Sequence, residues 1–183
     1  MKIHFIKKSD ALLIIVDVQE KLFPHIDHAC DILEKILILA KGFQILQIPI
    51  LLTEQYPKGL GHTISPLKTV LDSIEPYAKT TFSAAHDETI RQEILNCGRN
   101  QIILVGLEAH ICILQTAKDL LAMGKEVIIV NDAISSRSIY DFSTAIAELR
   151  DYGARITSTE TLLFELLRDA KTPEFKEITA LIS

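Results

Sequence analysis

The sequence predicts an α/β fold in which helices cover both faces of an open parallel sheet. Short aliphatic runs recur along the chain, they lack polar–apolar alternation, and segments with helical spacing separate them. Continuous apolar strands are typical of parallel sheets, because helices bury both of their faces. The predicted strands cover residues 11–17, 49–53, 101–105, 126–130 and 154–157.

Cap residues and glycines bound two of the predicted helices. Asp87 precedes a segment with apolar helical spacing that ends at Gly98, and Ser138 precedes one that ends at Gly153. Asp and Ser side chains accept hydrogen bonds from the first helical turn, and glycine readily takes the left-handed conformation that ends a helix. Each segment is therefore predicted to be a helix that connects two strands.

Apolar spacing predicts three further helices. Residues 112–123 form one that ends at Gly124, and a terminal helix with Pro173 at its first position is expected to dock on the rest of the chain. Residues 29–47 are apolar over much of the helix circumference. One sheet face cannot cover that surface, so either deep burial within the monomer or a subunit interface would explain it.

Composition excludes several classes of protein. The 183 residues fit one domain, expected to span residues 1–183, at about 150 residues per domain. A hydrophobic content of 48% excludes intrinsic disorder. The net charge is −5 and no basic run could neutralise a row of phosphates, so no nucleic-acid partner is expected. No apolar run approaches the roughly 20 residues that span a bilayer, so no membrane partner is expected.

Asp17 is the first candidate for chemistry. In open α/β sheets, ligands bind beyond the carboxyl ends of the strands. Asp17 directly follows an aliphatic run, which places a carboxylate at that edge, partly removed from water and suited to accept a proton. The equally weighted alternative is that Asp17 caps the following turn.

Cys112 is the candidate nucleophile among three cysteines. None of them shows CxxC spacing, so we expect no disulfide framework and no zinc site, as in a reducing cytoplasm. Cys112 is expected at a helix start, where free N–H groups would lower its pKa and favour the thiolate. The alternative is that Cys112 is only a buried cysteine at a helix start. Cys30 and Cys97 are expected to be small buried residues. Lys79 could supply a nearby cation, although an isolated lysine is usually a solvated surface charge.

Four segments together resemble the isochorismatase-like family of cysteine hydrolases: IIVDVQ, AKTTFSA, LVGLEAHICILQTAKDLL and VNDAISSRS. They occur in the family's order, and the resemblance covers nearly the whole chain. It implies a three-layer α/β/α fold with about six parallel strands in the order 3-2-1-4-5-6. It also implies a catalytic triad of Asp17, Lys79 and Cys112, with the lysine on the third strand and the other two facing each other across strands one and four.

The resemblance also implies a mechanism. It places a cis peptide bond between Leu107 and Glu108, with the backbone N–H groups of Glu108 and Cys112 converging on one oxyanion. Asp17 would take the thiol proton, the thiolate would attack an amide carbonyl, and the protonated carboxyl would return the proton to the leaving amine. Water would then hydrolyse the thioester. This cycle requires no cofactor.

Differences between this sequence and some members of the family limit the reactions that we expect of it. Nicotinamidases of the family bind a metal through an acid and histidines after the second strand, but here the segment reads LLTEQYPKGLGH. Glu54 and the distant His62 are a poor substitute, so no catalytic metal is expected. His25 and His28 are expected to be surface residues. True isochorismatases cleave a vinyl ether and lack the cysteine, so Cys112 favours amide chemistry.

The substrate is expected to be a small molecule. Gln19, Leu22, Phe82 and Ile111 flank the triad positions and are candidate substrate-binding residues, although each could equally belong to the core. Arg137, at a strand end, is a candidate clamp for a substrate carboxylate.

The sequence thus predicts a metal-independent cysteine hydrolase that cleaves a small amide and forms homo-oligomers, dimers or larger. Two alternatives stay open: a catalytically silent oligomeric binding or stress-response module, and a thiol redox sensor with the same fold.

Overall fold

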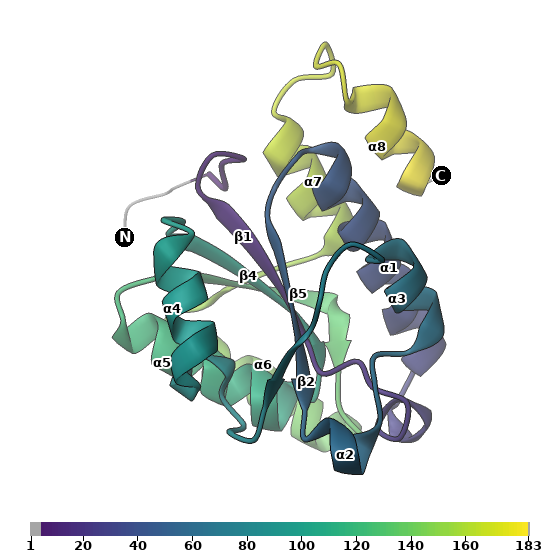
Figure 1. Ribbon diagram of the computed structural model, residues 1–183. Helices are drawn as coiled ribbons and strands as arrows, with labels where there is room; N and C mark the ends of the chain where they lie inside the picture. Colours follow the sequence, from purple (N-terminus) through teal and green to yellow (C-terminus); the bar gives the residue numbers. More distant parts are fainter. Residues whose placement is uncertain (1–4, 183) are drawn as a thin grey trace.

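The computed structural model describes residues 5–182 and contains one six-stranded, all-parallel sheet (Figure 1). The strand order is β3-β2-β1-β4-β5-β6, which confirms the expected 3-2-1-4-5-6 topology. The strands are β1 (Ala11–Val16), β2 (Ile50–Gln55), β3 (Tyr77–Lys79), β4 (Gln101–Leu107), β5 (Glu126–Ser135) and β6 (Arg155–Thr157). This order places β1 and β4 side by side at the centre, as the resemblance implied.

Helices cover both faces of the sheet (Figure 1). One layer consists of α1 (Ala29–Ile45), α3 (Ser65–Val70), α7 (Thr159–Leu167) and α8 (Phe175–Ile182). The other consists of α4 (Glu88–Asn96), α5 (Leu114–Ala122) and α6 (Ile139–Asp151). The short α2 (Pro57–Leu60) follows β2 at the carboxyl edge of the sheet. Within the described residues, no helix has the length and apolar character needed to cross a membrane.

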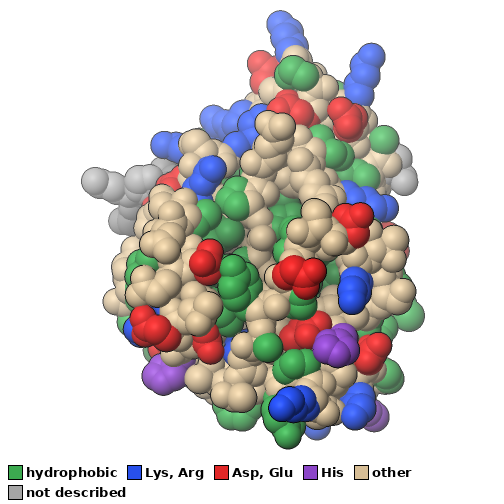
Figure 2. Space-filling model, in the orientation of Figure 1, with side chains coloured by type: hydrophobic (Ala, Val, Ile, Leu, Met, Phe, Trp, Pro, Cys, Tyr) green, Lys and Arg blue, Asp and Glu red, His purple; other side chains and the backbone are tan. Residues whose placement is uncertain are grey.

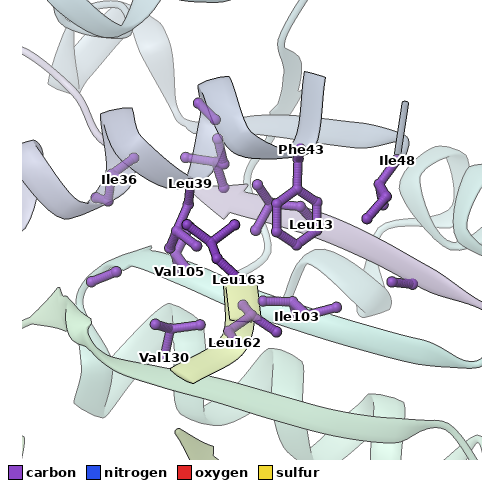
Figure 3. Close-up of a cluster of buried hydrophobic side chains, with 14 of the residues drawn as sticks. Leu13, Ile36, Leu39, Phe43, Ile48, Ile103, Val105, Val130, Leu162 and Leu163 are labelled. Atoms are coloured by element: carbon purple, nitrogen blue, oxygen red, sulfur yellow. The ribbon is translucent and has the colours of Figure 1, made fainter. Parts of the chain in front are cut away.

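The core beneath α1 accounts for the apolar circumference of that helix. Figure 3 shows side chains of α1 and α7 meeting those of β1, β4 and β5. Besides the sheet, α3, α7 and α8 pack against α1, and Phe43 is completely buried. The monomer itself therefore covers much of this surface, which supports deep burial for that part. Leu33, Leu37, Ile38 and Ile45 stay only partly buried, so the subunit-interface alternative stays open for the rest.

Most predicted elements are confirmed, and the differences lie at their ends. Asp87 and Ser138 cap α4 and α6 as expected: Asp87 accepts hydrogen bonds from two N–H groups of the first turn, and Ser138 accepts one. The terminal helix docks on α1, but it begins at Phe175, two residues after Pro173. The residue patterns did not predict β3, α2, α3 or α7, which are short or lack a clear start signal.

Gly106 lets β4 approach β1 closely just before the carboxyl edge. Its φ is +112°, and a β-carbon built there would lie 2.1 Å from the Val16 carbonyl oxygen. Only glycine fits both the conformation and the space. The contact lies next to Asp17, so the strand spacing that Gly106 permits also sets the position of that residue.

Candidate active site

The three residues of the expected triad converge at the carboxyl edge of the sheet. Asp17 follows β1 directly, Lys79 ends β3, and Cys112 lies in a π-helical turn, Ala109–Ile113, just after β4. Lys79 Nζ lies 2.7 Å from Asp17 Oδ2, and both side chains are fully buried. Each of the two is close enough to the Cys112 thiol to shift its pKa through charge and hydrogen bonding.

The electrostatics of Cys112 differ from the expectation. Burial raises the pKa of the Cys112 thiol well above its ordinary value, the Asp17 carboxylate raises it further, and Lys79 offsets only part of this rise. The prediction of a lowered pKa was wrong, because the thiol lies inside the π-helical turn before α5, where the residue is only 6% exposed. The resting sulfur is therefore a neutral thiol beside an ion pair.

The ammonium of Lys79 is fully engaged by the protein. Its partners are Asp17 Oδ2 at 2.7 Å, Gln55 Oε1 at 2.6 Å, and the carbonyl oxygens of Thr81 and Phe82 at 3.2 and 3.0 Å. Three N–H donors thus face four acceptors. This arrangement fixes the charge of Lys79 in place and leaves no donor for a ligand.

Replacing Lys79 with methionine is expected to destabilise the fold by about 3–5 kcal/mol, because it leaves the Asp17 carboxylate buried without its counter-charge. Chemical denaturation of the variant measures the loss. Lys41→Met, at an exposed position of α1, serves as control. The double variant with Asp17→Asn is expected to recover part of the loss, and a Lys79→Met protein as stable as the wild type would contradict the role of the pair.

Two residues of β2 that the sequence did not reveal complete this network. Thr53 Oγ1 donates to Asp17 Oδ1 at 2.7 Å, and Gln55 Oε1 accepts from Lys79. They are two positions apart and therefore lie on the same side of the strand. Their sequence signal is weak, since polar residues at the end of a buried strand have many roles.

The candidate substrate-binding residues differ in their placement. Gln19 is completely buried, and its side-chain amide is bonded to backbone groups of Gln55 and Gly61. Gln19 therefore ties the end of β2 to the segment after α2, and its contact with a substrate stays a prediction. Leu22 and Ile111 are half-buried at the margins of the two cores, and Phe82 is exposed.

The segment before Cys112 is tied to the end of β5. The Leu107–Glu108 peptide bond is cis, as the resemblance implied. Glu108 Oε1 accepts a hydrogen bond from Arg137 Nε at 2.9 Å, and His110 Nδ1 lies 2.9 Å from Ser136 Oγ. The guanidinium of Arg137, the candidate carboxylate clamp, is thus anchored on Glu108 and more than half exposed.

The other two cysteines also correct an expectation. Cys30 is exposed at the start of α1 and Cys97 is half-buried, whereas both were expected to be buried. His25 and His28 are exposed, as expected. Across residues 5–182, no three His, Cys, Asp or Glu side chains gather into a group that could hold a metal ion.

Glu54 and His62 lie together, although the sequence separates them. Glu54 Oε1 accepts from the N–H and hydroxyl of Thr63 at 2.7 and 2.8 Å, and His62 Nδ1 lies 3.2 Å from Oε2. Burial pushes the pKa of Glu54 upward, but the hydrogen bonds from Thr63 and the bond and charge of His62 outweigh it and hold the pKa below 4.5. Glu54 is therefore an ionised carboxylate that fixes the loop after α2 through Thr63 and His62.

The ionised Glu54 and its contacts with Thr63 and His62 predict that the free energy of unfolding depends on pH. Since the folded-state pKa of Glu54 lies below its unfolded value, its contribution is complete above pH 4.5 and is lost as the pH falls through the folded-state pKa. Glu54→Gln is expected to cost about 1–3 kcal/mol at pH 7, and the difference from wild type should shrink toward pH 3. Urea unfolding at both pH values measures it, with the exposed Glu75→Gln as control. A loss of stability in Glu54→Gln that does not change with pH would contradict this role of the Glu54 charge.

Comparisons with known proteins identify relatives of the whole fold. A family model described as the isochorismatase domain matches residues 11–161. Isochorismatase domain-containing protein 2 of Danio rerio is 42% identical over 174 residues, which cover 94% of this chain and 87% of that protein.

Two solved structures are similar throughout. The MAR1 ribonuclease of Caenorhabditis elegans has a TM-score of 0.91 at 37% identity and covers 98% of this chain and 92% of its own. The YcaC gene product of Escherichia coli, described as an octameric hydrolase of unknown specificity, has a TM-score of 0.89 at 20% identity and covers 98% and 97%. At that identity the second likeness concerns the fold alone.

Proposed function

The chain belongs to the isochorismatase family, which indicates a hydrolase, and from this we propose that it is a metal-independent cysteine hydrolase that cleaves the C–N bond of a small amide. The observation that carries the proposal is the convergence of Asp17, Lys79 and Cys112. A carboxylate, a fixed cation and a thiol within reach of one another are sufficient for nucleophilic acyl transfer.

The first half of the reaction uses the neutral resting thiol. Asp17 takes the proton from Cys112 as Sγ attacks the carbonyl carbon, which forms an S–C bond and moves the carbonyl electron pair onto oxygen. The N–H groups of Glu108 and Cys112 are proposed to hold this oxyanion, and within the described residues the Glu108 N–H donates to no other group. The protonated Asp17 then gives its proton to the nitrogen as the C–N bond breaks.

The second half returns the enzyme to its starting state. Water gives a proton to Asp17 and attacks the thioester carbon, and collapse of the intermediate breaks the C–S bond. Asp17 then reprotonates the sulfur. The ammonium of Lys79 compensates the carboxylate charge throughout, and because its N–H groups are all engaged, it acts through its charge and not as a proton donor.

A panel of small primary amides tests the proposal, with ammonia release as the first readout. Mass spectrometry of the acid-quenched reaction should find an acyl group on the peptide that contains Cys112. The proposal fails if an amide is hydrolysed without any adduct and independently of the thiol. Aryl and alkyl amides with and without a carboxylate belong in the panel, because the exposed part of Arg137 lies near this site.

A ribonuclease is the second candidate, since a 37% identical structure carries that name. The charge distribution opposes it. In the view of Figure 2, Lys and Arg side chains gather toward the end that carries the α7–α8 connection, where Lys7, Lys8 and Arg168 border a pocket. That end holds the amino ends of the strands, away from Cys112. Cleavage of RNA by the wild type but not by Cys112→Ala would favour this candidate.

The burial of Cys112 also weighs against a redox sensor, which needs an accessible thiol with a lowered pKa. We further propose that the protein acts as a homo-oligomer in a reducing cytoplasm. The partly buried apolar residues of α1 agree with a subunit interface, and three free cysteines agree with a reducing compartment. Light scattering of the purified protein tests the assembly, and a monomer at micromolar concentration would contradict it.

A further inference from the structure

Strand β2 lies between the strands that carry the lysine and the aspartate, and it contacts both residues through side chains. In the register of the sheet, Thr53 stands beside Val16, the residue before Asp17, and Gln55 stands beside Lys79. Neither β2 residue belongs to the triad. Both are buried, so their polar atoms must find partners inside the protein.

Thr53 holds Asp17 at two points. Its carbonyl oxygen accepts the backbone N–H of Asp17 at 3.2 Å, and its hydroxyl donates to Asp17 Oδ1 at 2.7 Å. Lys79 holds the other carboxylate oxygen, Oδ2, at 2.7 Å. With a donor on each oxygen, rotation of the carboxylate about its last bond would break at least one of two short hydrogen bonds.

Gln55 acts on Lys79 in a different way. Its Oε1 accepts from the ammonium at 2.6 Å while its Nε2 donates to the Thr80 carbonyl at 2.9 Å, so the amide oxygen is fixed toward the lysine. The ammonium would keep three acceptors for its three N–H groups without Gln55. Asp17 Oδ1, in contrast, would lose the hydroxyl donor that Thr53 supplies.

We propose that Thr53 is a positioning residue whose hydroxyl fixes the Asp17 carboxylate in the orientation that accepts the Cys112 proton. The inference rests on the proposed cysteine chemistry and deepens it, since it says which contact makes Asp17 an effective base. Thr53 itself is completely buried and acts only through Asp17. General-base catalysis contributes about 10²–10⁴ in rate, so a base with an unfixed orientation loses a measurable part of it.

Alkylation by iodoacetamide tests the inference without any amide substrate. The proteins compared are the wild type and the variants Thr53→Val, Thr53→Ser and Thr53→Ala. They form two pairs of similar size, Thr with Val and Ser with Ala, and in each pair only the first member has a hydroxyl. Peptide mass spectrometry follows Cys112, and the exposed Cys30 of the same molecule is the internal reference. Thermal unfolding of each variant shows whether it is folded.

We expect alkylation of Cys112 to be at least tenfold slower in the Val and Ala variants and within twofold of the wild-type rate in the Ser variant. The alkylation rate of Cys30 should be the same in all four proteins. Thr157→Val, the same change at a buried position of β6, should leave the Cys112 rate within twofold of wild type. If the Thr53→Val variant does not fold, the Ala–Ser pair decides. Equal Cys112 rates with and without the hydroxyl would overturn the inference, whereas an inactive amide panel would bear only on the proposed function.

Discussion

Cys112→Ala is expected to abolish amide hydrolysis, with a fall of about 10⁴-fold or more in kcat/KM and no acyl adduct. Removing the nucleophile of a covalent mechanism removes the intermediate itself, and single changes in such catalytic units cost up to about 10⁶ in rate. Ammonia release on the most active amide of the panel measures the loss, and intact-protein mass spectrometry measures the adduct.

The matched control is Cys30→Ala, which removes an exposed thiol at the start of α1 and should leave turnover unchanged. Because the Cys112 side chain packs among buried residues, Cys112→Ser is a second test that keeps the volume of the site nearly constant. Turnover of the Ala variant close to that of the wild type would refute the cysteine mechanism.

The resting electrostatics of the site distinguish this mechanism from thiolate chemistry. The pKa of Cys112 is raised, and the N–H groups of the Lys79 ammonium already donate to oxygen acceptors of the protein. Lys79 therefore stabilises a free thiolate only weakly. The sulfur becomes nucleophilic only as Asp17 takes its proton. Oxidants that attack a standing thiolate should therefore react slowly, which separates a hydrolase from a sensor.

The fold could be predicted because aliphatic strands and glycine-ended helices leave a local signal. β1 and β4 each show an unbroken aliphatic run, whereas β3 has three residues, Tyr77–Lys79, and owes its existence to pairing with β2. A strand that short has no periodicity to detect. Only the family resemblance placed Lys79 on it.

The candidate site was predictable only in part. The residue pattern offered Asp17, Lys79 and Cys112 as separate candidates, and the matched segments joined them into a triad. The role of Thr53 depends instead on sheet register, which brings β2 beside Asp17. The pKa of Cys112 was predicted in the wrong direction, because desolvation and the nearby Asp17 carboxylate are properties of the tertiary structure. Glu54 and His62 meet for the same reason, through the path of the loop.

Gly106→Ala is expected to be the most destabilising Gly→Ala change among the seven glycines of the chain. The new β-carbon would lie 2.1 Å from the Val16 carbonyl oxygen and 2.7 Å from the Val16 nitrogen, so β1 and β4 would have to separate at the centre of the sheet. Overpacking of a dense core costs about 1–3 kcal/mol or more, and the left-handed backbone adds about 1–2 kcal/mol. Urea unfolding should therefore show a loss of about 3 kcal/mol or greater, with Asp17 displaced and hydrolysis lost in any protein that still folds.

Gly124→Ala separates the two contributions. Gly124 also has a positive φ, +79°, but a β-carbon there would meet nothing within 4 Å. Its cost should be only the backbone part, about 1–2 kcal/mol, with activity retained. If the two variants lost equal stability, the close approach of β4 to Val16 would not be what glycine provides at position 106, and the spacing of the central strands would have to be set by other contacts.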